Sequence, residues 1–226
     1  MKYQHIVRGR FLERPNRFIA YVEVDGERTV CHVKNTGRCR ELLIPNTVVI
    51  LAKGGNPNRK TAYDLVAVYK GDRLINLDSQ APNAVFGEWV RESGYFPDLT
   101  CVKPEHTYQN SRFDFYLEAG ARKIFVEVKG VTLEQDGVVL FPDAPTERGT
   151  KHLRELADAV ENGYEAFLFF VIQMDACKYF APNRVTDPNF ALALEQATES
   201  GVELRAVTCR VTDDGLEIAD FAEIRL

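Results

Sequence analysis

The sequence has little of what secreted, zinc-binding or membrane proteins need. Its five cysteines are odd in number and scattered, and none forms a C-x-x-C pair, which argues against a disulfide framework or a structural zinc site. The longest apolar run, residues 166–172, is far shorter than the roughly 20 residues that span a bilayer. Residues 1–5 contain no apolar signal core. We therefore expect a cytoplasmic protein with no membrane partner.

An excess of positive charge is also absent, since the net charge is -5. The charge is nevertheless divided along the chain. Residues 1–80 hold 14 Lys and Arg against 8 Asp and Glu, whereas residues 81–226 hold 14 against 25. A basic N-terminal part suits a polyanion and an acidic C-terminal part suits metal ions, although ordinary solvated surfaces would give the same division.

The chain is long enough for one large domain or two small ones. It has 226 residues, of which 45% are hydrophobic and 27% charged, a composition typical of globular proteins.

Residues 1–80 read as β-structure. Apolar and polar side chains alternate in residues 18–24, and the hairpin signal Asp25-Gly26 follows. Further strands fit residues 28–33, 47–52, 63–69 and 74–77, with turn signals at 54–58 and 70–72. Five or six short strands with almost no helix predict a small closed barrel. An oligonucleotide-binding (OB) barrel fits this size, and an SH3-like barrel is the alternative.

Residues 81–226 mix helices and strands, so we place a domain boundary at residue 80. Amphipathic or capped helices are predicted at residues 82–93, 150–162 and 187–200, and strands at 113–117, 124–131, 166–172 and 202–211. The first two strands form a hairpin, and the continuous apolar strand 166–172 indicates burial on both faces. The whole chain is predicted to be α/β, more narrowly α+β, with a mixed sheet flanked by helices in this second domain.

Two strands of that sheet carry a constellation of charged side chains. Glu127 and Lys129 point to the same face of their strand, and the hairpin can bring Asp114 beside Glu127. Two neighbouring carboxylates repel unless a cation lies between them, and Mg²⁺ or Mn²⁺ is the hard cation that such oxygens prefer. Lys129 could orient an attacking water or stabilise a phosphate. We therefore predict Asp114, Glu127 and Lys129 as catalytic residues of phosphodiester hydrolysis.

Glu88, on the predicted helix 82–93, is a candidate third metal ligand with Asp114 and Glu127. The order of helix with Glu, strand with Asp and strand with Glu-x-Lys resembles the PD-(D/E)xK nuclease superfamily. This sequence departs from that pattern because Asp114 follows Phe113 and not a proline. We interpret the true Pro-Asp pairs, at residues 97–98 and 142–143, as unrelated to the metal site.

Residues 141–153 form a second dense segment. Two prolines hold its approach extended, and helix N-termini bind anions through free N–H groups. Arg148, Thr150 and Lys151 are therefore candidates for holding a phosphate of the bound strand. We interpret His152 as a packing or capping histidine.

Basic residues also gather in the predicted barrel, where aromatic side chains (Phe11, Phe18 and Tyr21) are interspersed. Such a surface can follow a nucleic-acid backbone without reading its sequence. The predicted DNA-binding residues there are Arg8, Arg10, Arg14, Arg17, Lys34, Arg38 and Arg40.

Four segments together resemble one family. They are residues 35–37, 111–115, 126–129 and the long motif 141–156, and they are similar to the sugar fermentation stimulation protein A family over nearly the whole chain. The resemblance implies DNA binding, a link to expression of sugar-utilisation genes, and an OB-like domain (1–80) followed by a PD-(D/E)xK-like domain (81–226). Asp114, Glu127 and Lys129 match the nuclease-like positions.

The sequence thus predicts a DNA-binding protein without strong sequence specificity that carries a Mg²⁺- or Mn²⁺-dependent deoxyribonuclease-type site. The alternative is a non-catalytic DNA-binding regulator of sugar-utilisation genes on a nuclease-like scaffold. A protein–protein adaptor has no positive signal. The strandedness of the DNA stays open, and so does a homo-oligomer.

Overall fold

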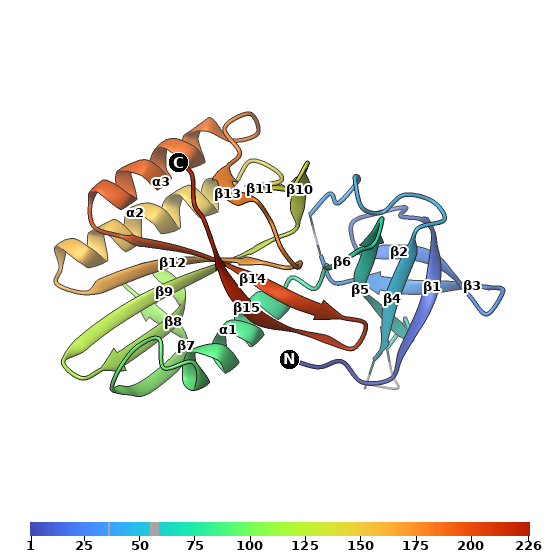
Figure 1. Cartoon of the computed structure of the whole chain (residues 1–226), viewed down its shortest axis with the longest axis horizontal. Helices are drawn as coiled ribbons and strands as arrows, with labels where there is room; N and C mark the ends of the chain where they lie inside the picture. Colours follow the sequence, from blue (N-terminus) through green and yellow to red (C-terminus); the bar gives the residue numbers. More distant parts are fainter. Residues whose placement is uncertain (36, 55–58) are drawn as a thin grey trace.

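The computed structural model describes residues 1–35, 37–54 and 59–226 and shows two domains side by side (Figure 1). Thr36 of the family motif and residues 55–58 of the predicted turn 54–58 lie outside the described residues. Within the described ranges, no helix combines the length and the apolar character needed to cross a bilayer.

The N-terminal domain is a closed β-barrel. Its strands are β1 (Ile6–Glu13), β2 (Ile19–Val24), β3 (Glu27–Val33), β4 (Val48–Lys53), β5 (Tyr63–Lys70) and β6 (Arg73–Asn76). The strand order is β3-β2-β1-β4-β5-β6, and a parallel pairing of β3 with β5 closes five of the strands into a barrel. This confirms the predicted OB-like barrel.

The barrel core explains both the apolar alternation and the cysteines. Val22, Leu51 and Leu65 are fully buried in it, and so is the Cys31 thiol. Burial raises the pKa of Cys31 to about 12, so this thiol behaves as a small apolar side chain. β1, to which the sequence assigned no range, contains Gly9, where a Cβ would lie 2.5 Å from Val22 Cγ1.

The C-terminal domain is built on a mixed six-stranded sheet with the order β15-β14-β12-β9-β8-β7. These strands are β7 (Leu99–Tyr108), β8 (Ser111–Ala119), β9 (Arg122–Val131), β12 (Glu165–Ile172), β14 (Glu203–Thr212) and β15 (Gly215–Ala222). Helix α1 (Ala81–Glu92) covers one face, and α2 (Glu147–Glu161) and α3 (Pro188–Glu199) cover the other (Figure 1). A small sheet of β10 (Leu133–Gln135), β11 (Val138–Phe141) and β13 (Tyr179–Pro182) lies beside them.

This mixed sheet with flanking helices confirms the predicted fold class. The predicted hairpin is β8–β9, and the apolar strand is β12, which pairs in parallel with both β9 and β14 and is therefore buried. Helix α2 begins at Glu147, three residues before the prediction, because the Thr146 hydroxyl caps it by accepting from the Gly149 amide.

The structure also contains strands that the sequence did not predict. β7 and β15 are the two edges of the large sheet, and of their residues only Gly215 and Leu216 are buried. Edge strands need no apolar alternation because they lack a fully covered face. β10, β11 and β13 have only three or four residues each, too few for a periodic signal.

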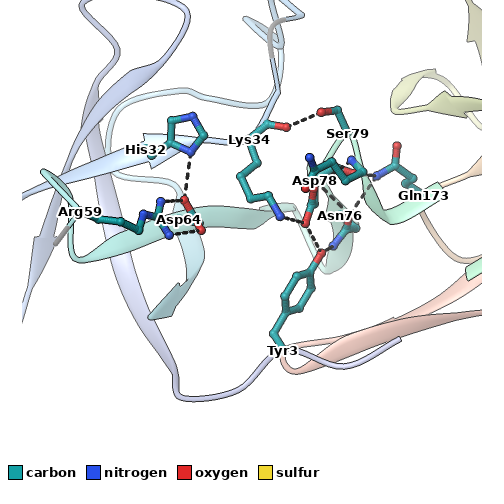
Figure 2. Close-up of polar contacts among 10 residues, drawn as sticks. Tyr3, His32, Lys34, Arg59, Asp64, Asn76, Asp78, Ser79 and Gln173 are labelled. Atoms are coloured by element: carbon teal, nitrogen blue, oxygen red, sulfur yellow. Dashed lines mark hydrogen bonds and ion pairs between the residues drawn. The ribbon is translucent and has the colours of Figure 1, made fainter. Parts of the chain in front are cut away.

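The two domains meet at a buried polar junction around Asp78 (Figure 2). Asp78 is completely buried, and its Oδ2 accepts from the Lys34 ammonium of the barrel at 2.7 Å and from the Tyr3 hydroxyl at 3.1 Å. From the other domain, the amide of Gln173, the residue that follows β12, donates to the Asp78 carbonyl and to Asn76 Oδ1. Burying a charge is costly unless it is paired and hydrogen-bonded, and here every partner comes from a different segment.

The chain start belongs to this junction as well. Met1 and Tyr3 exchange backbone hydrogen bonds with the β14–β15 turn, through Leu216 and Asp214. The predicted boundary at residue 80 lies between β6 and α1, but the first residues pack on the C-terminal domain.

A second interdomain contact predicts a pH dependence of stability. Glu134 of β10 accepts from the Lys70 ammonium at 2.6 Å, and the Arg73 guanidinium lies 3.5 Å away. Burial alone would raise the pKa of Glu134, but Lys70, the Gly137 amide and Arg73 together bring it below its usual range. Because the folded pKa is the lower one, ionised Glu134 stabilises the fold above the unfolded pKa of about 4.3, and this stability is lost as the pH falls through the folded pKa.

We expect Glu134→Gln to lower the free energy of unfolding at pH 7 by about 1–2 kcal/mol. In urea unfolding, the difference from the wild type should shrink as the pH falls below about 4.3. Glu217→Gln is the matched control, since Glu217 pairs with Arg210 on the exposed surface and should change little. An equal loss in both variants, or a loss that persists at acid pH, would contradict the assignment.

Candidate metal and nucleic-acid site

Asp114 lies where β8 and β9 separate. Their antiparallel pairing runs from Ala119↔Arg122 to Phe115↔Val126, and one residue further on the Asp114 carboxylate accepts from the Val128 amide at 2.8 Å. On its other side, the amide of Asn83 in α1 donates to Asp114 Oδ1 at 2.7 Å. Asp114 is therefore fixed between β9 and the first turn of α1.

Glu127 is the centre of the site. It lies on β9, between β8 and β12, and only 2% of its surface is exposed. Its Oε1 accepts from both the Lys129 ammonium and the His152 ring, so Lys129 shares its face as the alternation predicts. Its Oε2 is fully buried and has no hydrogen-bond partner. A buried carboxylate oxygen without a partner is costly and suits a cation.

The electrostatics of the two carboxylates differ. Burial raises the pKa of Asp114, and the charge of Glu127 raises it further, against the opposing hydrogen bonds from Val128 and Asn83. Burial would also raise the pKa of Glu127, but His152 and Lys129 outweigh it and leave this pKa below its ordinary value. The charge of Glu127 is thus compensated by its neighbours, whereas the ionised form of Asp114 is disfavoured. A divalent cation between the two carboxylates would favour the ionised form of Asp114.

His152 does more than the packing or capping expected of it. It is buried, and its Nδ1 contacts Glu127. The Arg148 Nε lies 3.4 Å from His152 Nε2. Because arginine only donates, Nε2 is the acceptor, and the N–H of the ring is at Nδ1, which donates to Glu127. The signal was available in the sequence, because His152 lies four residues before Leu156 on the buried face of α2. Asn83 had no such signal.

Glu88, the third predicted ligand, lies elsewhere. Its carboxylate accepts from the Met1 ammonium at 2.5 Å and is more than half exposed. Across the described ranges, no group of three or more His, Cys, Asp or Glu side chains is placed to hold a metal ion. The chain thus brings Asp114 and Glu127 together without Glu88.

Two carboxylates with one partnerless oxygen fit a particular kind of ion. Mg²⁺ keeps several waters and is commonly bound by one or two carboxylates together with substrate phosphates, not by a complete protein cage. The residues present are therefore compatible with a hard divalent cation whose coordination is completed by ligands from outside the protein.

The start of α2 places its three predicted phosphate-binding residues differently. Arg148 is exposed and reaches the site through His152. The Thr150 hydroxyl donates to the Thr146 carbonyl inside the helix cap, and Lys151 pairs with Glu155. Arg148 is thus the one of the three that contacts a residue of the site, His152.

The basic residues of the barrel also divide into two groups. Arg8 pairs with Asp213, Lys34 pairs with the buried Asp78, and the Arg14 guanidinium donates to main-chain carbonyls. The side chains of these three residues are therefore engaged by partners within the protein. The others are exposed and have no acidic partner among the described residues: Arg10, Arg17, Arg38 and Arg40.

Comparisons with known proteins agree with this architecture. A family model described as the SfsA N-terminal OB domain matches residues 12–77, and one described as the Sugar fermentation stimulation protein RE domain matches residues 80–215. The first description decides against the SH3-like alternative. Fold and matches together define a two-domain protein in which an OB barrel precedes an RE-type domain.

Relatives make the family specific. The chain is 61% identical to the sugar fermentation stimulation protein homolog of Desulfitobacterium hafniense (strain Y51), over 100% of this chain and 99% of that protein. It is 55% identical to the homolog of Clostridium beijerinckii over the full length of both. The chain therefore belongs to the sugar fermentation stimulation protein (SfsA) family. The structure of Pyrococcus furiosus SfsA in complex with Ca²⁺ matches with a TM-score of 0.91 and 25% identity, over 100% of this chain and 98% of that one.

The contact between His152 and Glu127 predicts a large and specific loss of stability. His152→Ala removes a donor from a buried carboxylate, so we expect the free energy of unfolding to fall by about 2–4 kcal/mol. Urea unfolding measures this, and Arg154→Ala, at an exposed position of the same helix, is the control.

A double-mutant cycle separates this contact from simple packing. In a Glu127→Gln background the charge is gone, so His152→Ala should cost less than it does in the wild type. An unchanged cost would mean that His152 acts through packing alone.

Proposed function

We propose that this protein binds DNA and hydrolyses phosphodiester bonds with Mg²⁺ or Mn²⁺ held by Asp114 and Glu127. The observation that carries the proposal is the buried, partnerless Oε2 of Glu127 beside the Asp114 carboxylate. The Ca²⁺ complex of the P. furiosus relative supports it, because Ca²⁺ and Mg²⁺ both prefer oxygen ligands.

Each neighbouring side chain has a role in this proposal. A bound divalent ion would polarise the phosphoryl oxygen and help to generate the attacking hydroxide. Lys129 stabilises the negative charge that develops on the phosphate or orients the attacking water. His152 keeps Glu127 ionised and oriented, as partners of metal ligands do, and Arg148 is near enough to hold a phosphate of the strand.

The barrel supplies the DNA-binding surface in this proposal. Four exposed arginines without acidic partners in the described chain are available for phosphates. Phosphate contacts carry no sequence information, so we expect binding without strong sequence preference.

One observation favours the alternative, a non-catalytic DNA-binding regulator on a nuclease-like scaffold. Lys129 and His152 already compensate the charge of Glu127 and lower its pKa. The buried carboxylate is therefore tolerated without metal, which is what a scaffold that had lost catalysis would require.

Metal dependence tests the proposal directly. We expect Mn²⁺ to raise the thermal midpoint of the wild type and to support cleavage of plasmid and of linear single strands. Glu127→Gln should lose both effects. Glu88→Gln is the matched control, because Glu88 binds the N-terminus, and it should keep both. If the wild type cleaved no more than Glu127→Gln, the nuclease proposal would be wrong and the non-catalytic regulator would be favoured.

Lys129 separates metal binding from chemistry. We expect Lys129→Met to keep the Mn²⁺-dependent rise in thermal midpoint while cleavage falls about 10²–10³-fold, the usual loss for one group that stabilises the transition state. Lys123→Met, at an exposed position near the start of β9, controls for the loss of a positive charge. Full activity of Lys129→Met would remove Lys129 from the catalytic set.

A further inference from the structure

The barrel carries a basic pocket of about 540 Å³, lined by the end of β1 and by the connections β1–β2 and β3–β4. This volume lies in the range of ligand-binding pockets. Four arginines line it, and the single acid among the lining residues, Glu13, is paired with Arg28. The pocket is therefore strongly positive.

Arg14 has a structural role in this pocket, because its guanidinium is hydrogen-bonded within the protein and is not available to a ligand. Its guanidinium donates to the carbonyls of Asn35, Gly37 and Arg38 on one side and of Arg17 on the other. These bonds tie together the two loops that carry the remaining arginines. Arg17, Arg38 and Arg40 are left exposed, and within the described ranges none of them has an acidic partner.

Part of the pocket wall is apolar, which a site for a simple anion does not need. Leu12, Leu43 and Pro45 line it. Phe18 follows Arg17 in the chain and is 51% exposed, and Ile44, between Leu43 and Pro45, is 53% exposed. The Arg17 guanidinium lies 5.7 Å from the Phe18 ring centre. Phe18 is thus an exposed aromatic ring beside Arg17, one of the lining arginines, and an exposed ring next to an unpaired arginine is an arrangement on which unpaired bases stack.

The loop with Arg38 also lies next to the C-terminal domain. A Cβ on Gly37 would come within 2.8 Å of Asp143 Oδ2. A cavity of about 130 Å³ beside it is lined by Asn35 of the barrel loop, by Asp143 and by Gly130 of β9, and Gly130 directly follows Lys129. The basic pocket is therefore linked to the strand that carries the carboxylate site.

We propose that this pocket binds an unpaired nucleotide of a single-stranded nucleic acid, with its phosphates on Arg17, Arg38 and Arg40 and its base against Phe18. The inference rests on the proposed nucleic-acid function and adds the strandedness of the substrate. A duplex cannot use the apolar part of the pocket, because its bases are stacked on one another and only its phosphates reach the arginines.

The test is fluorescence anisotropy of the full chain with four labelled probes: a single-stranded oligonucleotide, its duplex, an abasic strand of equal length and a mononucleotide. The wild type should bind the single strand more tightly than the duplex or the abasic strand, and the mononucleotide far more weakly. Phe18→Ser should weaken single-strand binding about tenfold, within the range measured for one stacked base, and leave abasic binding unchanged.

The charge part has its own variant and control. Arg38→Gln/Arg40→Gln should reduce the slope of log K against log salt for the single strand by about 1.4, since each lost phosphate contact contributes about 0.7. Lys103→Gln/Lys123→Gln removes the same charge from exposed positions of the C-terminal domain and should leave the slope unchanged.

The outcomes separate the inference from the proposed function. Duplex binding as tight as single-strand binding and unaffected by Phe18→Ser would overturn the pocket assignment while nucleic-acid binding stands. A mononucleotide that binds as tightly as the strand would overturn it in favour of a free nucleotide. No binding of any probe at low salt would overturn both the inference and the proposed function.

Discussion

The buried carboxylate of Asp78 is the contact on which the arrangement of both domains depends. Lys34 reaches it from the barrel, Tyr3 from the chain start, and the Gln80 amide, at the first residue before α1, donates to its Oδ1. An isolated ion could not remain in this position. Because Lys34 and Tyr3 come from segments far from Asp78 in the sequence, the charge is tolerated only when the barrel, the N-terminal segment and the start of α1 are all in place.

This junction extends to the carboxylate site by short steps. Asn83, one turn into α1, holds Asp114. On the opposite side, Gln173 is bound to the junction, and a Cβ on Gly130 would lie 2.6 Å from both Gln173 Oε1 and Pro82 Cγ. A side chain at position 130 would therefore push β9 away from the start of α1. The position of Asp114 relative to Glu127 is thus set by interdomain packing as well as by the β8–β9 hairpin.

Strand alternation was sufficient to predict that Glu127 and Lys129 share a face and that Asp114 lies near them, because these are local properties of two adjacent strands. Glu88 shows the limit of the same reasoning. A helical position alone does not say what lies opposite it, and the partner of Glu88 is the chain terminus, 87 residues away. The partners of the basic barrel residues could not be predicted from the sequence either, since Lys34 and Arg14 have the sequence context of exposed surface cations. Their partners, Asp78 and a set of main-chain carbonyls, appear only when the loops fold together. The edge strands β7 and β15 escaped prediction because exposure removes the apolar pattern on which such predictions depend.

The division of charge along the chain acquires a structural meaning from these contacts. Part of the positive excess of the barrel is used within the protein: Arg8 and Lys70 pair with Asp213 and Glu134 of the acidic domain. These pairs draw the two oppositely charged domains together. The cations that remain unpaired in the described chain, notably Arg17, Arg38 and Arg40, lie around a pocket on the barrel. Two acidic residues of the C-terminal domain are buried at the carboxylate site. Glu127 contacts Lys129 and His152, while the pKa of Asp114 is raised. A polyanion drawn to the arginines would meet two carboxylates that repel it unless a divalent cation lies between them. In the proposed function, nucleic-acid binding at the carboxylate site and metal binding should therefore reinforce one another.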